Sequence, residues 1–188
     1  MSEVVRLTLV SHAMTDAVSA GRFPTDEPLN AQGHRQVDAS VELGPTDAAY
    51  CGPEKRTRQT ADLLGLQAVV DPLLADLDCG RWRGDVLGGV QPADLAIWLT
   101  DPTQAPHGGE SVVAVIERVR RWMDTLSDRR GRIVAVTHPA VVRAAILVAL
   151  DAPARSFWRI DVAPASRTVL HFRGHAWTLR STHQGSTH

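Results

Sequence analysis

Two stretches, LTLVSH (residues 7–12) and IVAVTH (residues 133–138), decide the fold. Each is a short apolar run that ends in a hydroxyl residue and then a histidine. Nearly unbroken apolar runs are typical of strands in a parallel sheet, because both faces of such a sheet are covered. Sites in open α/β sheets lie beyond the carboxyl ends of the strands. We therefore expect His12 and His138 to meet in one crevice if the two strands are neighbours.

Helix and strand signals alternate along the rest of the chain, which predicts a mainly parallel sheet covered by helices. The expected strands are 4–10, 47–52, 66–71 and 131–138, with closing pieces at 157–163, 166–172 and 176–181. The expected helices start at Asn30 (through about Val41), Glu54 (through Leu64), Ser111 and Pro139 (through about Leu150). The predicted fold class is α/β, a three-layer sandwich whose closing strands form an antiparallel edge.

Composition limits the kind of protein. The chain has 188 residues, 44% of them hydrophobic, and a net charge of −1. These values predict a single domain over residues 1–188 that recruits neither nucleic acid nor an anionic membrane. The basic cluster RVRRW (118–122) is interpreted as a solvated helix face. By base rate we expect a homodimer.

The start of the chain carries charges where a signal peptide needs an apolar stretch, and no run approaches the roughly 20 apolar residues of a membrane span. Cys51 and Cys79 form no CxxC pair, so we expect free thiols. Together these features predict a cytoplasmic protein.

Residues 84–110 are rich in glycine and proline, with one short amphipathic piece around 93–99. We interpret this excursion as a cover over a site. It contains no lysine or arginine, so it suits a less charged or partly apolar ligand.

Three further segments carry candidate site residues. Arg56 lies at the start of the predicted helix 54–64, where free N–H groups favour an anion. Asp76 and Asp78 lie in a loop rich in turn residues. The segment HGGES (107–111) leads into another helix start.

Six segments follow one another as SHAMT (11–15), PLNAQGHRQ (28–36), GPEKRTRQTA (52–61), LADLDCGRWRG (74–84), GGES (108–111) and VTHPA (136–140). Their order resembles the motifs RHGxT, PLTxxGxxQ, SPLxRxxQTA, LxExxFGxWEG, GGES and VSHGG of the histidine phosphatase superfamily, the phosphoglycerate-mutase-like proteins. The resemblance runs from about residue 5 to residue 180.

This resemblance implies two-step phosphoryl transfer. His12 would attack phosphorus and become phosphohistidine, with its other ring nitrogen held by a nearby backbone carbonyl. Arg56 and His138 would bind the phosphoryl oxygens, and Asp76 would protonate the leaving group and then help to activate water.

Substrate contacts are expected from Ser11, Thr15 and Arg22, with Ser19 a further candidate. The ligand would be a small phosphorylated substrate or inorganic phosphate. No metal or cofactor is implied, and no zinc spacing such as HExxH occurs.

The sequence departs from the family pattern at and next to the predicted catalytic residues. Ser11 replaces the arginine before the nucleophile, Ala13 replaces the following glycine, and Asp76 replaces the usual glutamate. Pro139 and Ala140 stand where the second histidine motif has two glycines. Losing one charge-stabilising donor typically lowers a rate by about 10²–10³.

Arg22 and Arg58 are candidates to fill the place of the missing arginine, and Asp78 is an alternative acid. Three functions follow. The first is a slow or specialised phosphomonoesterase acting on a small phosphorylated metabolite. The alternatives are an impaired member that binds an anionic ligand without turnover, and an interaction protein. A mutase is less favoured, because the cover lacks the cations that a doubly phosphorylated, carboxylated intermediate would need.

Overall fold

The computed structural model describes residues 4–38 and 43–183. Within these ranges six strands form one sheet in the order β3-β2-β4-β1-β5-β6. The two strands that decide the fold, β1 (Val5–Ser11) and β4 (Gly131–Thr137), are parallel neighbours in its centre, and Ser11 lies opposite Thr137. His12 and His138 therefore leave the sheet side by side.

The other strands extend the sheet on both sides of this central pair. β2 pairs parallel with β4, and β3 pairs parallel with β2. β5 pairs antiparallel with β1, and β6 with β5. Their bounds are Ala48–Cys51 for β2, Val69–Val70 for β3, Arg167–Arg173 for β5 and Ala176–His183 for β6.

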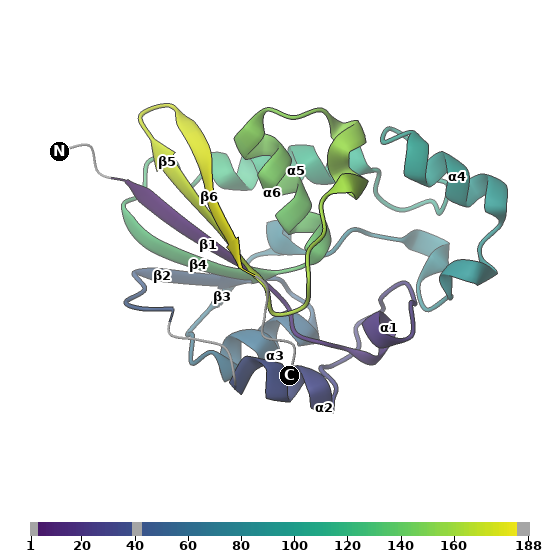
Figure 1. The fold of residues 1–188 in the computed structure, drawn as a ribbon, viewed down its shortest axis with the longest axis horizontal. Helices are drawn as coiled ribbons and strands as arrows, with labels where there is room; N and C mark the ends of the chain where they lie inside the picture. The colour runs from purple at the N-terminus through teal and green to yellow at the C-terminus, as the bar shows by residue number, and fades with distance from the viewer. Residues whose placement is uncertain (1–3, 39–42, 184–188) are drawn as a thin grey trace.

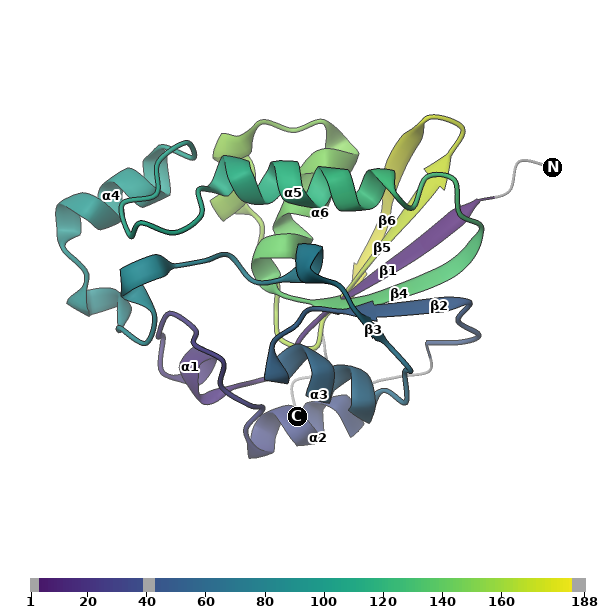
Figure 2. The same ribbon diagram turned by 180° about the vertical axis from the view of Figure 1, so that it is seen from behind.

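Helices cover both faces of the sheet, as Figures 1 and 2 show. α5 and α6 lie on one face, and α2 and α3 lie on the other. The bounds are Ala31–Asp38 for α2, Lys55–Leu63 for α3, Val112–Asp124 for α5 and Pro139–Leu150 for α6. The predicted α/β class, with a mainly parallel sheet and an antiparallel edge, is confirmed.

Short helices occupy the connections between these elements. They are α1 (Asp16–Ser19), α4 (Pro92–Thr100) and the 3₁₀ turns η1 (Pro72–Leu74), η2 (Gly80–Trp82), η3 (Leu87–Gly89) and η4 (Ala154–Arg159). The cover at residues 84–110 contains η3 and α4, so its amphipathic piece is a helix. In the described ranges no helix is long and apolar enough to span a membrane.

Local sequence signals explain where the main helices begin. The Asn30 carboxamide oxygen accepts a hydrogen bond from the Gly33 amide, and the Ser111 hydroxyl accepts one from the Ala114 amide, as expected of N-caps. Pro139 starts α6 because a first-turn residue needs no N–H partner. The expected end of α2 near Val41 falls outside the described residues.

One strand prediction is wrong, and another is too long. Residues 157–163 do not form a strand. Phe157 and Trp158 belong to η4, and Phe157 is fully buried in the core. Their apolar character serves packing against α6 rather than strand pairing. The strand expected at 66–71 shortens to Val69–Val70, an exposed pair at the sheet edge. Both cysteines are free and buried, as expected.

Candidate active site

The fold brings the two strand-end histidines together. His12 follows β1, and its amide donates to the Thr137 carbonyl at 2.8 Å. His138 is the N-cap of α6. The two rings lie edge to face with centroids 5.3 Å apart, and both side chains are buried. The crevice that the sequence predicts at these strand ends therefore exists.

His12 is held as a neutral imidazole. Its Nδ1 lies 2.8 Å from the Ala13 carbonyl oxygen. Because a carbonyl only accepts, Nδ1 carries the proton and Nε2 keeps its lone pair. Burial lowers the pKa of His12 to about 3, and the positive charges of His138 and Arg56 act in the same direction. A neutral ring with a free Nε2 lone pair is the form that a histidine nucleophile requires.

Arg56 lies at the start of α3 and is 1% exposed. Its Nη1 donates to the Thr25 carbonyl at 2.7 Å, and its Nη2 donates to Asp76 Oδ2 at 2.7 Å. Glu27 adds a carboxylate oxygen at 3.8 Å from Nη1. The guanidinium is therefore fixed from one side, while its buried Nε has no partner among the described residues.

Two carboxylates flank the ring of His138. Glu54 Oε2 lies 2.7 Å from Nε2, and Asp76 Oδ2 lies 3.4 Å from Nδ1. Burial opposes ionisation of both acids. The hydrogen bond from His138 nevertheless lowers the pKa of Glu54, and the charges of His138 and Arg56 lower that of Asp76. Both acids are thus ionised in the free protein.

Sequence reasoning missed Glu54. Its signal was present, because it stands at the leucine position of the SPLxR pattern, in GPEKR. An ionised side chain there needs a buried partner, and that partner is His138.

The two candidate acids have different surroundings. Asp76 contacts Arg56 and lines the cavity beside His12. Asp78 is exposed, and its carboxylate pairs with Arg83 at 2.7 Å. The structure therefore brings Asp76, and not Asp78, to the histidines.

The residues expected to contact substrate are spread more widely. Arg22 lines the cavity, and its Nη1 donates to the Gly84 carbonyl at 3.4 Å. Thr15 does not line it, because its hydroxyl caps α1 by accepting from the Val18 amide. Ser11 is fully buried and also lies outside the lining. Arg58 is exposed on α3, so Arg22 is the better placed of the two replacement candidates.

Arg118 supports the loop that carries Asp76. Its guanidinium binds Glu110 through two hydrogen bonds of 2.8 Å, and it donates to the carbonyls of Leu73 (2.7 Å), Ala75 (2.9 Å) and Asp76 (3.4 Å). The prediction of a solvated face at 118–122 is thus wrong for Arg118, whose side chain is only 12% exposed. The same fold gives Glu110, the acid of the GGES segment, a structural partner.

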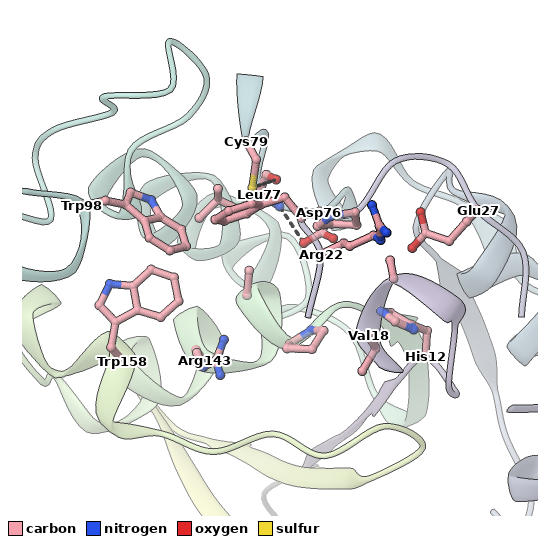
Figure 3. Close-up of a pocket in the computed structure, with 15 residues that line it drawn as sticks. His12, Val18, Arg22, Glu27, Asp76, Leu77, Cys79, Trp98, Arg143 and Trp158 are labelled. Carbon is pink, nitrogen blue, oxygen red and sulfur yellow. Dashed lines mark hydrogen bonds between the residues drawn. The ribbon is translucent and has the colours of Figure 1, made fainter. Parts of the chain in front are cut away.

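A cavity of about 180 Å³ opens beside His12. Figure 3 shows His12 and Val18 at one end, Trp98 and Trp158 at the other, and Arg143 between them. Most of the remaining lining is apolar, from Ala17, Phe23, Pro24, Leu77, Pro139 and Ala140. The cover therefore contributes an apolar wall through Trp98, while Leu99 is exposed.

Several buried polar atoms have no hydrogen-bond partner in the described ranges, and three of them belong to the predicted site residues. They are Ser11 Oγ, Arg56 Nε and His138 Nδ1. Unpartnered buried polar atoms are rare in folded proteins. None of the three residues lines the cavity beside His12, and His138 Nδ1 faces Asp76 Oδ2 at 3.4 Å. The Ser11 hydroxyl and Arg56 Nε are therefore the two of these atoms that face no charged partner.

The fold and the paired histidines define the class of protein, an α/β fold with two buried histidines at the carboxyl ends of its central parallel strands. A family model described as histidine phosphatase superfamily (branch 1) matches residues 7–184. The chain therefore belongs to the histidine phosphatase superfamily, as the order of its motifs predicts.

Named relatives are consistent with this assignment. A bifunctional protein of Mycobacterium tuberculosis is 30% identical over 182 residues, covering 89% of this chain and 50% of that protein. This chain thus spans about half the length of that relative. A glucosyl-3-phosphoglycerate phosphatase of the same species is 29% identical over 170 residues, covering 79% of this chain and 76% of that protein.

Solved structures agree with the fold. The mycobacterial glucosyl-3-phosphoglycerate phosphatase in complex with VO3 has a TM-score of 0.83 at 26% identity, covering 97% of this chain and 99% of that one. A structure titled mycobacterial hydrolase 1 has a TM-score of 0.84 at 25% identity, covering 97% and 100%.

Proposed function

We propose that the protein is a phosphomonoesterase that acts on a small phosphorylated metabolite through a phosphohistidine at His12. The observation that carries the proposal is the neutral His12 ring, edge to face with His138 and close to the buried Arg56 guanidinium, whose Nε has no partner in the described ranges. A nucleophile with its lone pair free and donors for phosphoryl oxygens are the two requirements of this chemistry. Phosphatases among the relatives also support it.

In the first step Nε2 of His12 forms a bond to phosphorus, and the bond from phosphorus to the ester oxygen breaks. The ester oxygen leaves with the electron pair and takes a proton by way of Asp76. In the second step water attacks the phosphohistidine, Asp76 accepts a water proton, and inorganic phosphate leaves His12 neutral again. Arg56 and His138 stabilise the charge on the phosphoryl oxygens in both steps.

The substitution at Ser11 predicts a slow enzyme. A serine hydroxyl offers one neutral hydrogen bond, whereas an arginine offers a bidentate charged contact. The site also holds the carboxylates of Glu27, Glu54 and Asp76, which oppose a dianion. We therefore expect turnover well below that of a site with the usual arginine, by about 10²–10³.

The test is to incubate the protein with a ³²P-labelled alkyl phosphate and to measure both phosphate release and acid-labile label on the protein. Label should map to His12 and be lost in His12→Ala. The matched control is His34→Ala, because His34 is exposed on α2. If the protein neither labels nor turns over but binds inorganic phosphate, it is an impaired, anion-binding member. If it binds no anion, the remaining alternative is that the protein serves as an interaction protein.

A further inference from the structure

Arg143 is a cation that the reaction at His12 does not use. It lies on α6 one turn after Pro139, and this spacing of four residues places both on the cavity side of the helix. In Figure 3 its guanidinium lies between the two tryptophans and His12. A group bound to Arg143 would therefore sit beside the alcohol part of a substrate whose phosphate is at His12.

The guanidinium of Arg143 has donors to spare. Its Nε donates to the Ile160 carbonyl at 2.7 Å, and its central carbon lies 5.5 Å from the Trp158 ring centroid and 5.8 Å from that of Phe157. Over residues 4–38 and 43–183, neither a carboxylate within ion-pair distance nor a hydrogen bond from its two Nη groups occurs. Burial lowers the pKa of Arg143, although attraction from Asp161 and Asp76 opposes this.

Trp98 and Trp158 form an apolar wall at the end of the cavity, with their rings inclined at 54° to each other. Their ring centroids lie 4.3 Å apart, so the rings contact each other and leave no slot between them. A ligand would stack against the pair from the cavity side. Apolar cavities of about 150 Å³ accommodate a benzene ring, so a cavity of about 180 Å³ has room for one ring against this wall.

Resting on the proposed function, we propose that the substrate is a phosphomonoester whose alcohol carries a carboxylate for Arg143 and a flat apolar group for the Trp98–Trp158 wall. A planar guanidinium with two free donor groups matches a carboxylate through paired hydrogen bonds. A second phosphate is the poorer match, because it carries close to two charges and Glu27 and Asp76 line the same cavity.

Four substrates separate the two recognition elements. 3-Carboxyphenyl phosphate carries both elements, 3-carbamoylphenyl phosphate carries the ring without the charge, phosphoglycolate carries the carboxylate without the ring, and ethyl phosphate carries neither. The quantity of interest is the ratio of kcat/KM between the carboxyl and carbamoyl esters. Comparing this ratio between variants cancels the intrinsic reactivity of the two esters.

The variant Arg143→Gln should lower the carboxyl-to-carbamoyl ratio by about 10- to 100-fold, the range of a hydrogen bond to a charged group. Arg143→Lys should retain part of the preference, since it keeps the charge but not the planar pair of donors. Arg159→Gln is the matched control, because Arg159 is exposed in the neighbouring η4 and should keep the parent ratio. Trp158→Ala should lower kcat/KM for both aryl esters about tenfold relative to kcat/KM for phosphoglycolate.

Binding of the non-hydrolysable 3-carboxybenzyl and 3-carbamoylbenzyl phosphonates, measured by tryptophan fluorescence, separates this inference from the proposed function. One outcome is that no ester turns over, but the carboxylated phosphonate binds more tightly than the carbamoyl one and loses that advantage in Arg143→Gln. In that case the proposed phosphatase activity is wrong and the proposed carboxylate site stands. If esters turn over but Arg143→Gln leaves the ratio unchanged, the inference is overturned and the phosphatase stands.

Discussion

Raising the pH from 6 to 8 should lower kcat/KM for an alkyl phosphate about 50-fold. Asp76 lies 2.7 Å from Arg56 Nη2 and 3.4 Å from His138 Nδ1, and its lowered pKa leaves it without a proton at neutral pH. The leaving alkoxide nevertheless needs one. The proton must therefore enter with the substrate monoanion, or reach Asp76 from water once the dianion has bound.

Both routes count the same number of protons and give the same pH profile. A phosphomonoester loses its second proton near pH 6, so the monoanion falls from about half of the substrate at pH 6 to about 1% at pH 8. On the acid side, His12 stays neutral until the pH approaches its pKa of about 3. The profile should thus be flat between roughly pH 4 and 6 and fall about tenfold per unit above.

The assay is single-turnover release of the alcohol, first for ethyl phosphate across this pH range and then for 4-nitrophenyl phosphate in the Asp76→Asn variant. A nitrophenolate leaves without much help, so Asp76→Asn should slow the ethyl ester by about 10²–10⁴ and the nitrophenyl ester far less. Asp78→Asn is the matched control. Equal losses for both esters, or a flat profile from pH 6 to 8, would refute the role of Asp76.

Further outcomes concern the supporting residues. Ser11→Arg should raise kcat/KM for ethyl phosphate by about 10²–10³ in a steady-state assay, and no gain would mean that another group already serves there. The free energy of unfolding, from urea titrations, should fall by up to about 1.4 kcal/mol per pH unit as the pH drops from 6.5 towards 3. The reason is that unfolded His12 binds a proton in this range and folded His12, with its pKa of about 3, does not; His12→Gln should remove much of this dependence. Arg118→Met should destabilise the fold by about 3 kcal/mol in the same titrations, because it leaves Glu110 unpaired and three carbonyls without their donor. A loss below about 0.5 kcal/mol would show that water replaces Arg118.

Much of the candidate site could be read from local pattern. Apolar runs that end in histidine are strands with a polar residue at the carboxyl end, and parallel neighbours must then present both histidines at one edge. The place of Arg56 could be predicted from a helix start, and the roles of Asn30 and Ser111 could be predicted from helix capping. These features depend on a few adjacent residues and on one relation between strands, so periodicity and motif order suffice to predict them.

The contacts that could not be predicted from the sequence join residues that are far apart along the chain. Glu54 and His138 are 84 positions apart, and Arg118 reaches carbonyls more than 40 positions away. The sequence marks Glu54 only as a departure from the SPLxR pattern and does not name its partner. Arg118 leaves no local signal, because an arginine on a helix looks the same whether it faces solvent or a loop. Composition also overpredicted the strand at 157–163, where Phe157 and Trp158 pack instead on α6 and Trp98.

The sequence by itself thus determined the order of the main strands and helices, apart from the wrong strand at 157–163, and the edge of the sheet that carries the candidate site. It also identified His12, Arg56 and His138 as the candidate residues there. Only the tertiary structure decided that Asp76 rather than Asp78 lies beside them, and that Arg143 faces the cavity with unused donors. The physical reason is the range of the forces involved. Hydrophobic periodicity and capping act over a few residues, whereas the charge and burial of a side chain depend on everything packed around it.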